Sequence, residues 1–249
     1  MQDNKMPKVQ VRNLTKKFGD LLVLNDISFD VHSGEFLCIV GPTGCGKTTF
    51  LNSLTKLYQP TAGEILLDGE PVDLKKHNIA YIFQEYSTMP WLTVEENVGF
   101  GLDIKGVEKS KAKALVDEYL DIVGLTKYRK YYPDQLSASM LQRVVIARAF
   151  ATQPDLLLMD EPYGQLDIQL RYHLEDELIS LWQRTGTTVL FITHNIEEAV
   201  YMGERILVLT NKPTSIKCAI DNDLSRPRDI ASPDFVKLRN EVTDLIKWW

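Results

Sequence analysis

The chain has 249 residues and a net charge of −6, with 44% hydrophobic and 25% charged residues, as in an ordinary soluble globular protein. This length suits one compact unit with a sizeable core, and the acidic balance argues against a nucleic-acid partner held mainly through phosphate contacts. No apolar run approaches the ~20 residues that cross a bilayer, and residues 1–5 lack the apolar start of a signal peptide. We therefore expect a protein of the cytosol, or of the cytosolic face of a membrane through a partner. Its three cysteines have no metal-like spacing, which favours reduced thiols.

The first third of the chain reads mainly as strands. Apolar and polar residues alternate over 9–14 and 27–31, which predicts two strands with one buried face each. The uninterrupted apolar run 36–40 predicts a buried strand. Residues 64–69 predict a further strand that ends in an Asp-Gly turn, and residues 79–83 predict a short apolar one.

The pattern changes to helical after Gln84. Apolar residues recur at helical spacing from about 93 to 151, and Gly124 is placed to end one of these helices. Ser137 is a candidate N-cap for a helix that continues to about residue 150. This segment has the character of a helical insertion within an α/β protein.

The α/β pattern then resumes. Apolar runs over 156–159, 188–192 and 206–209 predict buried strands, and residues 170–182 form an amphipathic helix. A second amphipathic helix is expected in the tail, over 234–249. Strands that alternate with helices imply a largely parallel central sheet.

A glycine-rich stretch follows the strand at 36–40. It matches the P-loop pattern G-x-x-x-x-G-K-[ST] at every fixed position, and a helix starts directly after it. In such a loop several backbone N–H groups and the helix N-terminus point at one anion. Lys47 would reach the β- and γ-phosphates, and the Thr48 hydroxyl would ligate Mg²⁺. The candidate ATP-binding residues are Gly41, Pro42, Thr43, Gly44, Cys45, Gly46, Lys47, Thr48 and Thr49.

Polar side chains follow the other apolar runs. Asp160 and Glu161 end the run at 156–159, at the sheet edge where ligands bind in open α/β sheets. Asp160 could hold Mg²⁺, and Glu161 could orient or deprotonate the attacking water. His194 follows the run at 188–192 and could contact a γ-phosphate. Gln84 could touch Mg²⁺ or water and report phosphate occupancy to the helices after it.

Taken together, these motifs resemble the nucleotide-binding subunits of ABC transporters over nearly the whole chain. The resemblance implies a P-loop NTPase (ABC ATPase) core of α/β class, with an N-terminal antiparallel β subdomain and an inserted α-helical subdomain. The core and β subdomain would comprise residues 1–85 and 151–226, the helical subdomain residues 86–150, and a helical tail residues 227–249.

The resemblance also implies roles for individual residues. Phe18 would stack on adenine, Gln84 would be the Q-loop residue, and Asp160 and Glu161 would be the Walker B pair. Asp167 would be the D-loop carboxylate and His194 the switch histidine. The family works as head-to-tail dimers, so the signature segment would face the ATP of a partner subunit. That segment is Ser137, Ala138, Ser139 and Met140.

Two further segments narrow the resemblance. Residues 89–94 and residues 226–229, followed by a short tail helix, look like those of the importers of nitrate, sulfonate, taurine and bicarbonate. Trp91 could also be a core residue, and the arginines at 226 and 228 could belong to a solvated turn. The expected function is the ATP-hydrolysing subunit of an importer, with ATP and Mg²⁺ bound. Its partners would be a second ATPase subunit, identical or different, permease subunits and, indirectly, a substrate-binding protein.

The signature departs from the family pattern Leu-Ser-Gly-Gly, because Ala138 and Ser139 replace both glycines. The new β-carbons could obstruct the approach to the γ-phosphate, in which case the subunit pairs with a different, intact partner. Alternatively, Ser139 supplies a new hydrogen bond in a working homodimer. A nucleotide-gated interaction module with weak turnover is therefore the rival function. A soluble ABC ATPase of repair or translation is less favoured, since the chain has neither a long coiled-coil insertion nor a second cassette. A P-loop kinase or GTPase leaves the signature unexplained.

Overall fold

The computed structural model describes residues 6–164 and 166–246. The chain forms two compact units. The first is built from the described parts of Met1–His77 and Thr188–Trp249, and the second is Asn78–Thr187. Among the described residues, no helix is both long and apolar enough to span a membrane.

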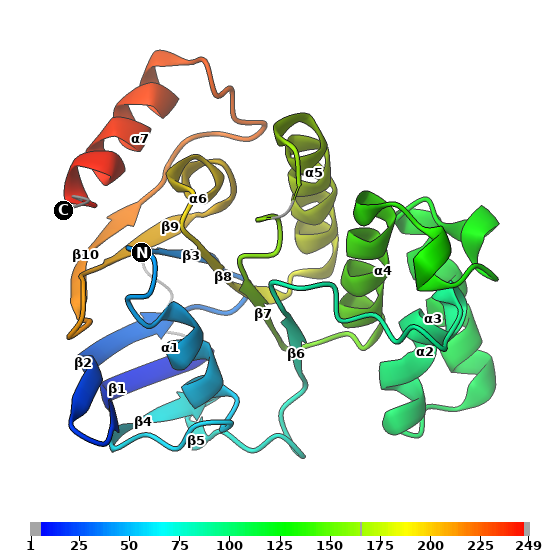
Figure 1. Cartoon of the computed structure of the whole chain (residues 1–249), viewed down its shortest axis with the longest axis horizontal. Helices are drawn as coiled ribbons and strands as arrows, with labels where there is room; N and C mark the ends of the chain where they lie inside the picture. The colour runs from blue at the N-terminus through cyan, green and yellow to red at the C-terminus, as the bar shows by residue number, and fades with distance from the viewer. Residues whose placement is uncertain (1–5, 165, 247–249) are drawn as a thin grey trace. The chain divides into compact units, whose positions relative to one another are not determined.

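An antiparallel sheet makes up the first part of the first unit. Its strand order is β2-β1-β4-β5, with bounds β1 Val9–Phe18, β2 Leu21–Val31, β4 Ala62–Leu67 and β5 Glu70–Pro71 (Figure 1). Asp68 and Gly69 connect β4 to β5 with φ angles of 53° and 78°. Positive φ at both central residues is the requirement of a type I′ hairpin turn, so the Asp-Gly turn is confirmed.

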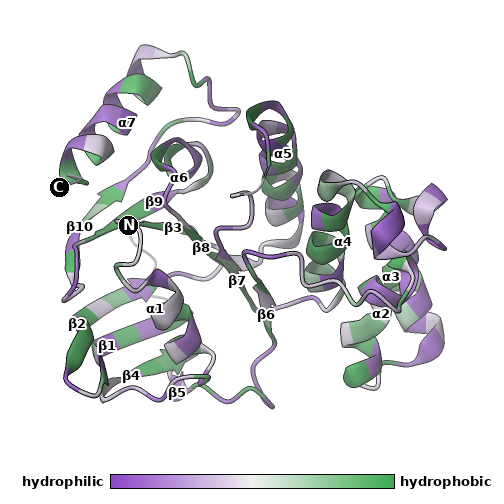
Figure 2. Cartoon of the chain, viewed as in Figure 1, coloured by the Kyte–Doolittle hydropathy of each residue, from purple (hydrophilic) through white to green (hydrophobic). Residues whose placement is uncertain are grey.

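The second sheet of this unit is mainly parallel and carries the glycine-rich loop. Strand β3 (Phe36–Val40) pairs in parallel with β8 (Thr188–Thr193) on one side and with β9 (Arg205–Leu209) on the other. All residues of β3 and β8 are buried, and Figure 2 shows these strands as hydrophobic. This confirms the parallel, fully buried strands that the apolar runs predict.

Three helices complete the first unit. They are α1 (Lys47–Leu54), α6 (Ile196–Met202) and α7 (Pro233–Leu245), and α7 packs on α6. In α7, Phe235 and Val242 are fully buried. The expected tail helix is thus present, and residues 247–249 lie outside the described part of the chain.

Besides the two-residue strand β5, two elements of this unit escape the sequence analysis. Strand β10 (Ile216–Asp221) pairs antiparallel with β9, and its inward side chains are only half-buried, which weakens the hydrophobic signal. Helix α6 has seven residues, too few to establish a helical period.

The second unit joins a parallel strand pair to a group of helices. Strands β6 (Ile79–Ile82) and β7 (Leu156–Asp160) pair in parallel. Helices α2 (Val94–Ile104), α3 (Lys109–Ile122) and α4 (Ala138–Ala151) pack on one another, and α5 (Ile168–Thr185) contacts α4 (Figure 1). Short 3-10 turns, Thr126–Tyr128 and Pro133–Gln135, connect α3 to α4.

The predicted ends of these helices are confirmed. The Ser137 side chain accepts a hydrogen bond from the Met140 N–H and caps α4, as an N-cap serine does. Gly124 follows the C-cap of α3 with φ 68°, the left-handed conformation that glycine supplies at this position.

Candidate functional site

The glycine-rich loop connects the buried strand β3 to helix α1. Gly44 and Gly46 have φ angles of 75° and 115°, which disfavour any residue with a β-carbon. A β-carbon on Gly46 would come within 2.8 Å of the Val23 side chain, and one on Gly41 within 2.9 Å of Leu209. The loop therefore packs closely against β2 and β9, and there is little space for a β-carbon at Gly41 or Gly46.

Charge and backbone geometry at this loop suit a phosphate. Lys47 is 5% exposed, and its ammonium donates to the carbonyl oxygens of Gly41 (3.0 Å) and Pro42 (3.2 Å). The N-cap of α1 is Gly46, which has no side chain to cover the first N–H groups of the helix. A helix N-terminus of this kind, with a lysine beside it, is suited to hold phosphate oxygens.

His194 lies at the same sheet edge as the loop. Val40 and Thr193 are register partners in the parallel pair β3/β8, so Gly41 and His194 leave the sheet side by side. The backbone around His194 is fixed by Thr193, whose buried hydroxyl donates to Glu198 (2.5 Å) and accepts from the Asn195 N–H (2.9 Å). Since the carboxyl ends of parallel strands share one edge, His194 and the glycine-rich loop follow the same edge of the sheet in this unit.

The other predicted polar residues follow the strand pair of the second unit. Ile82 and Met159 are register partners, so Gln84 and the Asp160-Glu161 pair follow at the same edge of β6 and β7. Asp160 is 6% exposed, whereas Gln84 is exposed. Glu161 has φ 46°, an unusual conformation for a residue with a side chain, of the kind found at functional sites.

Tyr81 is a neighbour of Asp160 that the sequence analysis misses. Its hydroxyl donates to the Asp160 carboxylate at 3.4 Å, and its ring stacks on Phe83 with centroids 4.2 Å apart. Burial, together with the Asp160 charge, raises the pKa of Tyr81, so its hydroxyl stays protonated and available as a donor. Its position in β6, three residues before Gln84, is the signal that could have identified it.

Phe18 ends strand β1 with 42% of its surface exposed. The Tyr58 ring lies edge-on to it, with centroids 5.3 Å apart, and the Lys16 ammonium lies 4.8 Å from the Phe18 centroid. Phe18 is thus an exposed aromatic ring held by two neighbours, which suits it to stack on a planar base.

The predicted signature segment begins helix α4. Ser137 and Ala138 are exposed, and Ser139 and Met140 are half-buried. The side-chain oxygens of Ser137 and Ser139 lie 3.0 Å apart and share a hydrogen bond. Asp167 caps α5, with its carboxylate accepting from the Leu170 N–H at 3.0 Å. Gln165, two residues before Asp167, lies outside the described residues.

The loop before α2 is held by two groups, one buried and one half-buried, that the sequence analysis does not single out. Asn97 is fully buried, accepts from the Met89 N–H at 2.8 Å and donates to the carbonyl oxygens of Met89, Leu92 and Thr93. Arg148 donates to Ser87, to both its backbone carbonyl and its hydroxyl, at 2.7 Å each. The loop held in this way presents Trp91 with 73% of its surface exposed, so Trp91 is not a core residue.

The arginines at 226 and 228 are not in a solvated turn. The Arg228 guanidinium is nearly buried and donates to five carbonyl oxygens around the end of α6. Arg226 donates to the carbonyl oxygens of Tyr201 and Met202. Burial lowers the pKa of Arg228 to about 10, so the group remains charged at neutral pH. The pair caps the helix that follows His194.

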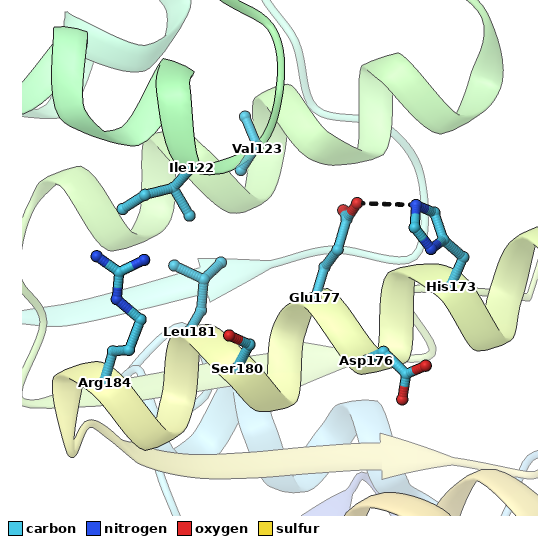
Figure 3. Close-up of a pocket in the computed structure, with 8 residues that line it drawn as sticks. All are labelled: Ile122, Val123, His173, Asp176, Glu177, Ser180, Leu181 and Arg184. Carbon is cyan, nitrogen blue, oxygen red and sulfur yellow. Dashed lines mark ion pairs between the residues drawn. The ribbon is translucent and has the colours of Figure 1, made fainter.

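A hollow between the end of α3 and α5 lies in the second unit (Figure 3). It has a volume of about 280 Å³, and its polar side includes the ion pair between His173 and Glu177 at 3.1 Å. None of the predicted site residues lines it.

Comparison with known proteins agrees with these motifs. The family model described as "ABC transporter" matches residues 24–164. An uncharacterized ABC transporter ATP-binding protein of Methanocaldococcus jannaschii is 42% identical over 99% of this chain and 94% of its own length. An aliphatic sulfonates import ATP-binding protein of Bacillus thuringiensis is 41% identical over 92% of this chain and 90% of its own. Among solved structures, a dimeric bacterial ABC transporter cassette is 31% identical, with a TM-score of 0.75 over 87% of this chain and 100% of its own.

Proposed function

Since the chain belongs to the ABC transporter family, it is the ATP-binding subunit of a transporter and an ATPase, and we propose that it powers import of a small anion. Nitrate, a sulfonate, taurine or bicarbonate are the candidate substrates. The similarity to the sulfonate import protein supports this proposal, and it favours a sulfonate among the four. The observation that carries ATP binding is the glycine loop between β3 and α1, with Lys47 folded over it.

The proposed nucleotide site uses residues 41–49 for the phosphates and Phe18 for the adenine. Glycines whose β-carbons would clash fit a loop that must bring its backbone close to an anion. Mg²⁺ would be held by Thr48, Gln84 and Asp160, whose hydroxyl, amide and carboxylate oxygens are the hard ligands that this ion prefers. When bound, Mg²⁺ supplies charge to neutralise the phosphates.

We assign the chemistry to Glu161, His194 and Gln84. Glu161 would take the proton of the attacking water as general base, and Gln84 would help to orient that water. His194 would hydrogen-bond the γ-phosphate, a role supported by its place beside the loop at the edge of β3 and β8.

The proposed assembly is a head-to-tail pair of ATPase subunits on the cytoplasmic face of the membrane. Ser137, Ala138, Ser139 and Met140 would face the ATP of the partner subunit, and Asp167 would lie at the same interface. Permease subunits would dock on the loop that exposes Trp91 and on the helical subdomain, proposed as residues 86–150. A substrate-binding protein would act indirectly, and no nucleic acid is involved.

Purified full-length protein tests the ATPase assignment. The Glu161→Gln variant should bind ATP with unchanged affinity, lose turnover at least a hundredfold, and form an ATP-dependent dimer in size-exclusion chromatography. Glu118→Gln, on the exposed side of α3, is the matched control and should turn over as wild type. A Glu161→Gln variant with the normal rate would contradict the assignment of the base.

Uptake tests the substrate. We expect genes for a permease and a binding protein beside the gene of this chain. The three are co-expressed, and uptake of labelled taurine, an alkanesulfonate, nitrate and bicarbonate is measured in cells. Sulfonate uptake that disappears with Glu161→Gln supports the proposal. If none of the four is taken up while another solute is, the proposed substrate class is wrong.

A further inference from the structure

Thr214 is a buried hydroxyl residue that the proposed function leaves without a role. It lies between β9 and β10 and is 0% exposed. Its N–H donates to the Val23 carbonyl oxygen at 2.9 Å, and its carbonyl oxygen accepts from the Asn25 N–H at 2.8 Å. These two bonds fix Thr214 against β2, on either side of Leu24.

The hydroxyl of Thr214 reaches the glycine-rich loop. It donates to the backbone carbonyl oxygen of Cys45. In a planar trans peptide the C=O and the N–H point in opposite directions. A hydroxyl that holds the Cys45 carbonyl on the side of β2 therefore aims the Gly46 N–H to the opposite side of the loop, where the phosphates would lie.

The same residues form the floor under Gly46. A β-carbon on Gly46 would meet Val23 at 2.8 Å, Leu24 at 3.2 Å and the Thr214 hydroxyl at 3.7 Å. Strand β2 in turn pairs with β1, where Lys16 faces Leu24 and Phe18 faces Leu21. Thr214 thus connects the phosphate side of the proposed nucleotide site to the strand pair that carries the base-stacking ring.

We propose that Thr214 is a positioning residue for the phosphates of ATP and acts through the Cys45–Gly46 peptide. This inference rests on the proposed nucleotide site. Loss of the hydroxyl frees that peptide to rotate, so a phosphate-binding N–H is lost part of the time while the fold remains. The affinity for ATP and ADP falls, and the rate of the bound complex is preserved because Thr214 contacts no reacting atom.

The test compares Thr214→Val, which removes the hydroxyl at nearly constant shape, with Thr214→Ser, which keeps it. Thr188→Val is the matched control, because Thr188 is also a buried threonine whose hydroxyl has a backbone partner. It accepts from the Gly34 N–H at the start of β8, away from the glycine-rich loop. For each full-length variant, the Kd of ATP and ADP, the KM and kcat of ATP hydrolysis, and the melting temperature without nucleotide are measured.

We expect Thr214→Val to raise Kd and KM about tenfold, as loss of one hydrogen bond to an anion does, with kcat within about twofold of wild type. Thr214→Ser and Thr188→Val should bind ATP within about twofold of wild type. The inference is overturned if Thr214→Val binds ATP normally, if Thr188→Val is equally weak, or if serine does not restore affinity. If Thr214→Val does not fold, Thr214→Ala is compared with Thr188→Ala by the same measurements, and the same outcomes decide. Wild-type protein that binds no ATP would instead refute the proposed function, and this inference with it.

Discussion

The hydroxyls of Ser137 and Ser139 lie 3.0 Å apart at the start of α4 and share a hydrogen bond. Ser137 also accepts from the Met140 N–H, so one of its lone pairs is already used. Whichever serine donates in the pair, one hydroxyl proton remains to point outward. With glycine at 139 the Ser137 proton would also be free, so Ser139 does not add a free proton; it fixes the orientation of the hydroxyl pair beside the helix N-terminus, where an anion is favoured.

The first prediction separates this donor from steric obstruction. Ser139→Ala keeps the β-carbon and removes the hydroxyl that orients Ser137, and we expect the ATPase rate at saturating ATP to fall about threefold, because the remaining donor is less firmly directed. If the β-carbons obstruct the γ-phosphate instead, the ATPase rate should not change with Ser139→Ala. It should rise with Ser139→Gly, or with glycine at both 138 and 139. A rate that increases only with glycine would contradict the donor role.

The second prediction concerns Tyr81 and Asp160. Tyr81→Phe removes the hydroxyl that donates to the carboxylate at 3.4 Å, a long hydrogen bond of modest strength. We expect the Mg²⁺ concentration for half-maximal ATPase activity to rise about twofold to threefold, because the carboxylate is less firmly oriented. Tyr86→Phe is the control, since the buried Tyr86 hydroxyl has no hydrogen-bond partner within the described chain. Equal Mg²⁺ dependence in all three proteins would rule out the positioning role.

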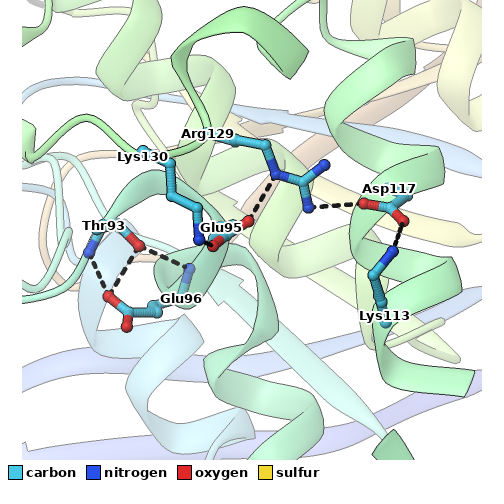
Figure 4. A network of polar contacts seen from close by, with 7 residues as sticks. All are labelled: Thr93, Glu95, Glu96, Lys113, Asp117, Arg129 and Lys130. Carbon is cyan, nitrogen blue, oxygen red and sulfur yellow. Dashed lines mark hydrogen bonds and ion pairs between the residues drawn. The ribbon is translucent and has the colours of Figure 1, made fainter. Parts of the chain in front are cut away.

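The third prediction concerns the stability of the helical group against acid. Arg129 bridges Glu95 and Asp117 at 2.6 and 2.7 Å, and Lys130 and Lys113 join the same network (Figure 4). Burial opposes ionisation of Glu95, but the hydrogen bonds from Lys130 and Arg129 outweigh it and lower the pKa of Glu95. Hydrogen bonds from Lys113 and Arg129 likewise lower the pKa of Asp117.

Because both folded-state pKa values lie below the ordinary values of 4.5 and 3.8, the network stabilises fully above pH 4.5 and loses its effect as pH falls through the lowered values. Arg129→Gln should cost about 1 kcal/mol at pH 7, since the pairs are partly solvated. The difference in unfolding free energy from wild type, measured by urea titration, should shrink toward zero below pH 4. A difference that is constant from pH 7 to pH 3 would contradict this account.

The fourth prediction concerns the cap on α6. Arg228→Met would remove the donor that five carbonyl oxygens share in a buried position. Asn222 would still donate to Val200 and Gly203, and Arg226 to Tyr201, so we expect a loss of about 3 kcal/mol in unfolding free energy, mainly from the Leu224 and Asn222 carbonyls. Arg228→Lys should recover only part of this, because an ammonium cannot reproduce the fork of a guanidinium. Arg239→Met, which breaks a partly exposed ion pair with Glu197, should cost less than 1 kcal/mol. Similar losses for Arg228→Met and Arg239→Met would refute the buried cap.

The sequence by itself determined most of the elements and the motifs. Uninterrupted apolar runs identified β3, β7, β8 and β9, since a strand buried on both faces leaves no room for polar residues. The glycine pattern identified the loop, because positive φ and close packing are properties of single residues that only glycine meets without strain. The N-cap at Ser137 could also be predicted, because its hydrogen bond joins residues only three positions apart.

Only the tertiary structure revealed the groups that support the site. Thr214 meets Cys45 from 169 positions away, Tyr81 meets Asp160 across a strand pair, and Arg228 reaches the end of α6 from the tail. Thr214 and Arg228 belong to no predicted element, Tyr81 belongs to the predicted strand at 79–83 without any mark of its partner, and each contact is fixed by chain packing. Hydrogen bonds of this kind depend on distances of a few ångströms between remote segments, which no local spacing in the sequence encodes.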